Sequence, residues 1–392
     1  MTISTFKIAN KLITGEGATG QLKVEAERLG MTNPLIVTDH IIQQTGMLNN
    51  IQEILEGLTC GVFLEVKPEP EFYVVEECRK AFQTGGHDGL IAIGGGSAMD
   101  TAKAVSGYAN YTGALVDLVG TDHVKQKGCP LIVIPTTAGT GSEVTNISIL
   151  SDKEEQVKKG IVSDYLLPDV AIVSPEMTLT MPAGVTAASG IDALVHAIEA
   201  YISVHASPIT DALAIGAMKM IAVNLPKAYA NPDNVQAREQ MATASLMAGM
   251  AFGNAGVGAV HALAYPLGGR FHIPHGVSNA LLLPYVMEWN KIACLERFRD
   301  VAAALGEKVD EATDNEAAEK AIAAMSRLCK AVRIPDGLQE LGIKETDLED
   351  MAEDASKIDR LLKNNPRRLN KADILAIYQA AYLGGERDAM EK

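Results

Sequence analysis

Residues 90–105 read LIAIGGGSAMDTAKAV, an apolar run followed by three glycines, a serine and an amphipathic stretch. This order predicts a buried strand that turns sharply into a helix. Bare backbone N–H groups at the N-terminus of such a helix favour an anion such as pyrophosphate. We therefore expect a phosphate cradle at Gly94, Gly95, Gly96 and Ser97. The alternative is a plain strand-to-helix turn in which Ser97 only caps the helix.

The same alternation extends on both sides of this motif. Apolar runs at 34–39, 61–66 and 129–137 are separated by stretches with helical periodicity at 40–58 and 72–85. Apolar runs of about five residues between helices are typical of a parallel sheet with helices on both faces. The N-terminal part of the chain is therefore predicted to be an α/β domain.

After residue 181 the pattern changes, and nearly every periodic stretch is helical, for example 192–204, 209–225 and 237–252. A chain of 392 residues is long enough for two domains, each with its own core. We predict an α/β domain over 1–181 and an all-helical domain over 182–392.

Composition excludes some partners. The formal net charge is −15 and there is no basic stripe, so we expect no nucleic-acid partner. Five cysteines without a CxxC pair, and an N-terminus without a secretion-signal pattern, favour a reducing cytoplasm.

Residues 241–269 carry no Asp, Glu, Lys or Arg, and this stretch is long enough to cross a bilayer. They contain Asn254, His261 and Pro266 without an aromatic belt, so we expect a buried helix and no membrane partner.

Four residues have the chemistry of a metal site. Asp192 and His196 lie one helical turn apart in GIDALVHAIEAY, and His261 and His275 follow in glycine-rich surroundings. One carboxylate and three imidazoles suit Fe²⁺ or Zn²⁺ and leave room for a further ligand. The alternative is a buried Asp–His pair with two unrelated histidines.

Two further features point to a nucleotide. The loop IPTTAGTGSEVTN, residues 134–146, follows an apolar run with alternating hydroxyls and glycines, and ligands of open α/β sheets bind at the carboxyl ends of strands. Asp39 ends the run at 34–39, where a carboxylate could bind ribose hydroxyls and repel a 2′-phosphate, which favours NAD(H) over NADP(H). Asp39 could instead cap a helix that begins at His40.

Together, the strand–GGGS–helix motif, TTAGTGSE at 136–143 and Asp-x3-His with two spaced histidines resemble the iron-containing (group III) alcohol dehydrogenases. The likeness extends from ITGEGA at 13–18 to NNPRRLN at 364–370. The resemblance implies a Rossmann-like N-terminal domain and an all-helical C-terminal domain, as in dehydroquinate synthase, with metal and nicotinamide meeting in the cleft between them.

The resemblance also assigns roles to residues of this chain. The metal ligands would be Asp192, His196, His261 and His275. The cofactor would contact Asp39, Gly95, Gly96, Ser97, Asp100, Thr136, Thr137, Thr140, Ser142 and, near the nicotinamide, Lys159. Phe252 would line the alcohol pocket.

The chain departs from the family pattern at Tyr265, at Ser174 and at Glu69. Tyr265 stands four residues after His261, where many members have another histidine. We therefore hypothesise a proton relay through the nicotinamide ribose hydroxyl and then Tyr265, His272 or water. Ser174-Pro175 replaces a common Asp-Pro, and Glu69, in Lys67-Pro68-Glu69-Pro70, replaces the middle residue of a usual PNP. We expect both of these changes to be peripheral.

The resemblance implies an NAD-dependent, metal-dependent alcohol dehydrogenase or aldehyde reductase that acts on small uncharged primary alcohols, diols or their aldehydes. Fe²⁺ is the expected metal with Zn²⁺ second, and a homodimer or larger homo-oligomer is expected. The alternatives are a glycerol-type polyol dehydrogenase, a dehydroquinate synthase-like lyase that uses NAD transiently, and a non-catalytic metal-binding protein. The lyase would need several Lys and Arg near the metal, and between His261 and His275 the sequence offers only Arg270.

Overall fold

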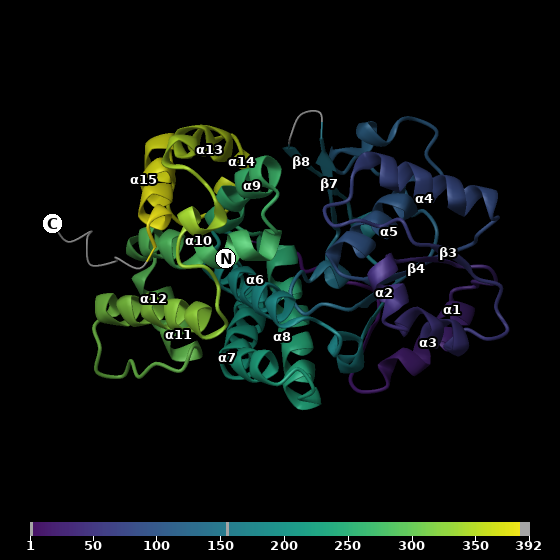
Figure 1. The fold of residues 1–392 in the computed structure, drawn as a ribbon, viewed down its shortest axis with the longest axis horizontal. Helices are drawn as coiled ribbons and strands as arrows, with labels where there is room; N and C mark the ends of the chain where they lie inside the picture. The colour runs from purple at the N-terminus through teal and green to yellow at the C-terminus, as the bar shows by residue number, and fades with distance from the viewer. Residues whose placement is uncertain (1–2, 154–156, 385–392) are drawn as a thin grey trace.

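The computed structural model describes residues 3–153 and 157–384. The chain forms an α/β half, purple to teal in Figure 1, followed by a helical half, teal-green to yellow. This division confirms the predicted fold class.

A six-stranded parallel sheet lies at the centre of the α/β half, with strand order β1-β9-β6-β4-β2-β3. Its strands are β1 (Leu12–Thr14), β2 (Leu35–Val37), β3 (Gly61–Phe63), β4 (Leu90–Gly94), β6 (Leu131–Pro135) and β9 (Val170–Val173). From β2 the chain adds β3 on one side of the sheet, and it then crosses to the other side to add β4, β6 and β9. The order in which strands are added therefore reverses between the neighbouring strands β2 and β4. Ligands of open α/β sheets bind outside the carboxyl ends of strands at such a reversal, and β4 leads directly into the GGGS motif.

Helices cover both faces of this sheet. They are α1 (Leu22–Arg28), α2 (His40–Gln44), α3 (Met47–Ile54), α4 (Phe72–Thr84) and α5 (Gly96–Tyr108). Alternate residues of β2 belong to different cores: Leu35 and Val37 pack on the side of α4 and α5, and Ile36 packs on the side of α1 to α3. Burial on both faces explains why these strands read as unbroken apolar runs.

A second, three-stranded sheet follows, with strand order β5-β8-β7. Its strands are β5 (Gly120–Thr121), β7 (Ile147–Asp152) and β8 (Val157–Val162). The antiparallel β7–β8 pair was not predicted, because its polar residues interrupt the apolar pattern.

Residues 183–384 contain helices and no β-strand. The helices are α6 (Ala183–Ile202), α7 (Pro208–Ala230), α8 (Val235–Ala255), α9 (Ala259–Phe271), α10 (His275–Asn290), α11 (Leu295–Ala304), α12 (Asp314–Ala331), α13 (Leu348–Ser356), α14 (Asp359–Leu362) and α15 (Lys371–Tyr382). Helix α6 is buried along most of its length and packs against α7, α8 and α10. It therefore holds its polar residues in the middle of the helical half.

By length and composition alone, α7 could cross a membrane, and 33% of its apolar window is buried inside the structure. The uncharged stretch at 241–269 forms parts of α8 and α9, which together pass the same test but meet at a bend of 102°. Most of the residues in α9 are buried inside the helical half, so this stretch is part of the protein core.

Candidate active site

Three helices of the helical half bring the predicted metal ligands together. Asp192 and His196 lie on α6, His261 on α9 and His275 at the start of α10. Asp192, His261 and His275 each offer a donor atom, and these atoms lie within 4.8 Å of one another. The Nε2 atom of His196 lies 3.0 Å from Nε2 of His261. The four side chains therefore converge, although they come from positions up to 83 residues apart in the sequence.

The hydrogen bonds of two of these histidines show which ring nitrogens are free. Nδ1 of His196 lies 3.1 Å from the carbonyl oxygen of Gly139, and Nδ1 of His261 lies 2.6 Å from a carboxylate oxygen of Glu199. Both acceptors require a hydrogen on Nδ1, so in the neutral rings both Nε2 atoms carry a lone pair. These two lone pairs face each other across 3.0 Å, and a shared cation would satisfy both. The donor set thus fits a divalent metal.

Burial sets the protonation states that a metal requires. It lowers the pKa of His196 to about 4 and that of His275 to about 3, so both imidazoles are neutral near pH 7. Burial acts to raise the pKa of Asp192, but electrostatic attraction to the protonated forms of the three nearby histidines and a hydrogen bond from Asn279 outweigh it and lower that pKa. The Nδ2 atom of Asn279 donates to Asp192 at 2.6 Å. A carboxylate and neutral imidazoles are the forms that bind metals.

Glu199 holds one of the metal ligands, His261, in place, and sequence reasoning did not identify it. Its Oε1 accepts a hydrogen bond of 2.6 Å from the backbone N–H of Val260, and its Oε2 accepts from His261. One buried carboxylate thus fixes both the first turn of α9 and the orientation of the ligand on it. The available signal was its position three residues after His196 on a helix whose other residues between 193 and 202 are mostly apolar.

The two predicted nucleotide loops lie in contact. Gly94 has φ 153°, and a Cβ there would lie 2.8 Å from the Cβ of Ala98. A Cβ on Gly96 would lie 3.1 Å from Cγ2 of Thr140 in the second loop. Among the described residues, the buried hydroxyl of Thr137 has no hydrogen-bond partner, so it is available to a ligand.

Asp100 and Ser142 join the two loops. The Ser142 hydroxyl donates to Oδ1 of Asp100 at 2.6 Å, and the backbone N–H of Ile149 donates to Oδ2 at 3.0 Å. The fully buried Lys103 donates to the Ser142 hydroxyl at 2.7 Å. Thr136 extends the β4–β6 pairing through a 2.9 Å bond from its N–H to the carbonyl of Gly94. This network fixes the second loop onto α5.

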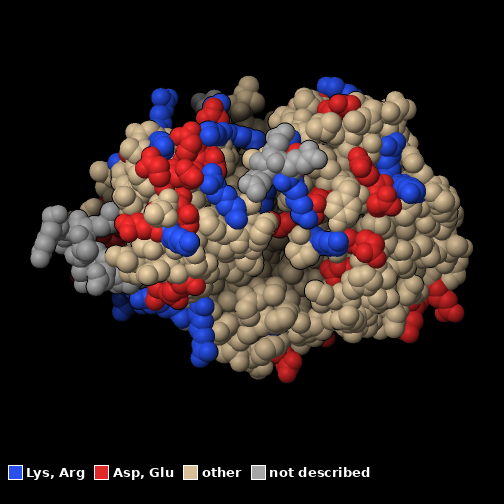
Figure 2. Space-filling model, turned by 45° about the horizontal axis from the view of Figure 1, so that its top comes forward, with Lys and Arg blue, Asp and Glu red and all other residues tan. Residues whose placement is uncertain are grey.

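One cavity of about 260 Å³ joins the two halves. From the α/β half, the predicted residues that line it are Gly96, Ser97, Asp100, Thr140 and Ser142, and from the helical half they are Asp192, His196, Phe252, His261, Tyr265 and His275. Asp39, Gly94, Gly95, Thr136, Thr137, Lys159 and His272 are not part of this lining. Figure 2 shows the surface hollowed between the two halves, with charged side chains around the hollow.

The aromatic and relay candidates lie at different places. The ring of Phe252 stacks on His196, with centroids 4.2 Å apart. Tyr265 lines the cavity, and its hydroxyl lies 3.5 Å from a guanidinium nitrogen of Arg360. His272 follows the last residue of α9 with φ 56°, and its side chain is exposed. The structure therefore brings Tyr265, but not His272, to the cavity.

Two residues of the α/β half differ from expectation. Lys158 lines the cavity, whereas Lys159 forms an ion pair with Asp152, because neighbouring residues of β8 point to opposite faces. Glu69, expected to be peripheral, also lines the cavity, and its Oε1 lies 2.7 Å from Nζ of Lys158. That expectation was wrong, because the β3–α4 loop folds toward β8 and α9.

Asp39 caps α2, as the alternative interpretation had it: its Oδ1 accepts a 2.9 Å hydrogen bond from the N–H of Ile42. Its Oδ2 lies 3.9 Å from the position that a Cβ on Gly94 would take. One carboxylate oxygen thus caps the helix, while the other lies beside the glycine loop. The second oxygen is therefore still able to accept a hydrogen bond from a ribose hydroxyl.

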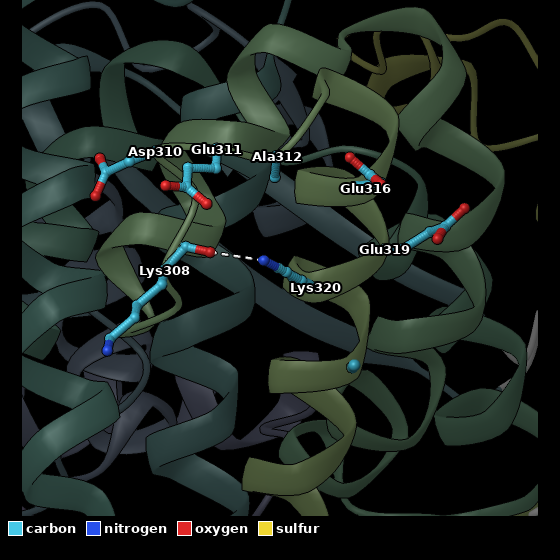
Figure 3. Close-up of a pocket in the computed structure, with 8 residues that line it drawn as sticks. Lys308, Asp310, Glu311, Ala312, Glu316, Glu319 and Lys320 are labelled. Atoms are coloured by element: carbon cyan, nitrogen blue, oxygen red, sulfur yellow. Dashed lines mark hydrogen bonds between the residues drawn. The ribbon is translucent and has the colours of Figure 1, made fainter.

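A larger hollow of about 730 Å³ lies on the helical half, along α12 and the segment before it (Figure 3). Acidic residues line much of it, and Nζ of Lys320 donates to the carbonyl of Lys308 at 2.7 Å. Its lining contains no histidine and shares no residue with the cavity described above.

An α/β half with two glycine-rich loops, facing a helical half with an Asp–His₃ cluster, defines a metal-dependent enzyme of the dehydrogenase class. Comparison with known proteins identifies the family. Residues 9–175 match the family model described as iron-containing alcohol dehydrogenase, and residues 186–382 match that of the Fe-containing alcohol dehydrogenase family, C-terminal. The chain belongs to the iron-containing alcohol dehydrogenase family.

Individual relatives agree over almost the whole chain. It is 46% identical to long-chain-alcohol dehydrogenase 1 of Geobacillus thermodenitrificans (strain NG80-2), with 94% of each chain covered. It is 40% identical to the NAD-dependent methanol dehydrogenase of Bacillus methanolicus, covering 97% of this chain and 100% of the relative. A crystal structure of 1,3-propanediol oxidoreductase superposes with a TM-score of 0.95 at 41% identity, covering 97% of this chain and 100% of the other.

Proposed function

We propose that Asp192, His196, His261 and His275 hold one divalent cation, and that the loops at 94–97 and 136–142 hold NAD(H) against it. The enzyme is an alcohol dehydrogenase or aldehyde reductase that acts on small alcohols and diols. The observation that carries the assignment of residues is the shared cavity, in which Ser97 and Thr140 face the same space as His261.

The cation would polarise the substrate oxygen, and NAD would accept or deliver the hydride. Phe252, Val257 and Leu361 supply apolar walls to the cavity, which favour an uncharged carbon chain and exclude water. Tyr265, in the same cavity, is the side chain that we assign to proton transfer with the reacting oxygen, because it is in reach and His272 is exposed.

The family supports Fe²⁺ as the metal, with Zn²⁺ as the alternative because it binds such ligands tightly. A relative that is named NAD-dependent and the carboxylate of Asp39 beside Gly94 support NAD over NADP. For the basic residue near the nicotinamide, Lys159 is a weaker candidate than Lys158, because Lys158 is the lysine of β8 that lines the cavity.

Three further assignments belong to this proposal. The domains meet at residues 181 and 182, between the end of β9 at Val173 and the start of α6 at Ala183. The five cysteines form no disulfide, which supports a cytoplasmic location. The enzyme works as a homodimer or larger homo-oligomer with small alcohols and aldehydes as its partners, without nucleic acid or membrane, consistent with a net charge of −15.

The test is to strip the purified protein of metal anaerobically and reload it separately with Fe²⁺ and Zn²⁺. Each form is then assayed for oxidation of NADH and NADPH with a panel of short aldehydes. We expect turnover only after reloading, with NADH preferred. Turnover that is equal with and without metal would contradict the metal assignment, and activity confined to NADPH would contradict the role of Asp39.

A further inference from the structure

Glu69 combines an unusual position, an unusual ion pair and an unusual backbone conformation. It lines the cavity, it forms an ion pair with Lys158, and it adopts φ 54° between Pro68 and Pro70. The left-handed conformation is unfavourable for glutamate and is better tolerated by asparagine or glycine. A strained residue that persists inside a binding cavity suggests a function for its side chain.

The carboxylate of Glu69 is only half used. Its Oε1 accepts a hydrogen bond from Nζ of Lys158, whose side chain is 9% exposed. Within the described ranges, Oε2 makes no hydrogen bond, and the side chain is 31% exposed. The lysine therefore fixes the carboxylate in place, and one oxygen remains able to accept a hydrogen bond from a ligand in the cavity.

The position of this carboxylate relative to the metal ligands can be measured along helix α9, which carries His261. A Cβ on Gly268 would lie 3.3 Å from Oε1 of Glu69 and 3.3 Å from Nζ of Lys158. Gly268 follows His261 by seven residues, so the two lie on the same face of α9, about 10 Å apart along its axis. Tyr265, between them on that face, lines the same cavity. Glu69 thus lies along the cavity from the reacting centre and not at it.

We propose that Glu69 is a specificity-determining residue that accepts a hydrogen bond from the second hydroxyl of a 1,3-diol or 3-hydroxyaldehyde. This inference rests on the proposed function. In an extended chain, two hydroxyl oxygens three carbons apart are separated by about 5 Å, and those two carbons apart by about 3.6 Å. A hydrogen bond adds about 2.7 Å. The longer diol therefore matches the spacing along α9 better than the shorter one.

The test compares the oxidation of 1,3-propanediol with that of 1-butanol, in which a methyl group replaces the second hydroxyl. Both are measured with NAD⁺ on metal-loaded enzyme, with kcat and KM determined separately. In Glu69→Asn, whose side chain is shorter, uncharged and suited to φ 54°, we expect the ratio of kcat/KM values, diol over butanol, to fall about tenfold. The change should lie in the diol's values, while those for butanol change less than threefold.

Two further variants sharpen the test. Glu69→Gln keeps an acceptor at the same reach and should lose only part of the preference. Glu71→Gln is the matched control, because Glu71 is two residues away and also pairs with a lysine, Lys153, but does not line the cavity. It should leave the ratio unchanged. Thermal unfolding of each variant shows which of them are folded.

An unchanged ratio in both Glu69 variants overturns the inference while leaving the proposed function intact. Loss of butanol oxidation in a folded Glu69→Asn enzyme also overturns it, because the residue would then act on the reaction itself. A wild-type enzyme that oxidised none of these alcohols would overturn the proposed function together with the inference.

Discussion

The carboxylate of Glu199 lies 2.6 Å from Nδ1 of His261, and its other oxygen accepts the N–H of Val260 one residue earlier. A residue of α6 therefore determines both the position of α9 and the direction in which the ligand nitrogen of His261 points. Carboxylates that orient a ligating imidazole in this way also raise its basicity.

Replacing Glu199 by glutamine should weaken metal binding about 10- to 100-fold, because the amide orients and polarises His261 less well than the carboxylate does. Metal affinity is measured by titration against a competing chelator. Glu288→Gln, at a more exposed position paired with Lys291, is the control and should bind metal normally. Equal affinities in the two variants would contradict a supporting role for Glu199.

Replacing His196 or His275 by alanine should abolish both metal content and turnover, because each removes one of four ligands. NAD binding should be retained within a few-fold, since the glycine-rich loops belong to the α/β half. Metal content is measured by elemental analysis and NADH binding by fluorescence. Loss of NADH binding at normal metal occupancy would be incompatible with this division of roles.

Tyr265→Phe should lower kcat about 100-fold and flatten its pH profile, because it removes the proton donor and acceptor that lines the cavity. His272→Ala should change neither, since that side chain is exposed. The two variants serve as controls for each other in steady-state kinetics across a pH series. The reverse outcome would transfer the relay to His272.

Asp39→Asn separates the two roles of this residue. Asparagine is as good a helix cap as aspartate, so the thermal unfolding temperature should stay the same. Loss of the negative charge should lower KM for NADP at least about tenfold, because the 2′-phosphate is no longer repelled. A large fall in unfolding temperature with no change in cofactor preference would leave Asp39 with the capping role alone.

Glu143→Gln tests a buried carboxyl in the second nucleotide loop. Burial raises the pKa of Glu143 from 4.5 to about 7, so its protonated form is favoured in the folded state. That contribution to stability is present below about pH 4.5 and is lost as the pH rises through 7. The variant should therefore be more stable than wild type at pH 8, by about 1 to 3 kcal/mol, with equal stability near pH 4.5. Denaturant unfolding at the two pH values measures this difference, and a constant difference would contradict the assignment.

Much of the fold followed from local patterns. The apolar runs at 34–39, 61–66 and 129–137 became β2, β3 and β6, and the GGGS motif joins β4 to α5 as expected. Buried strands and amphipathic helices leave a period in the sequence because each side chain's environment repeats with the backbone geometry. The β7–β8 pair escaped detection because its strands carry mixed, partly exposed side chains.

The sequence by itself determined the chemistry of the site: the kinds of metal donor, their helical spacing on α6 and the two glycine-rich loops. Only the tertiary structure decided how they meet. His196 and His261 are 65 residues apart and touch because α6, α9 and α10 pack together. The tertiary structure also decided that Lys158, and not Lys159, faces the cavity, and that Glu69 lines the same cavity. Local periodicity shows that two faces of a strand differ, but which face meets a ligand depends on packing between segments distant in the chain.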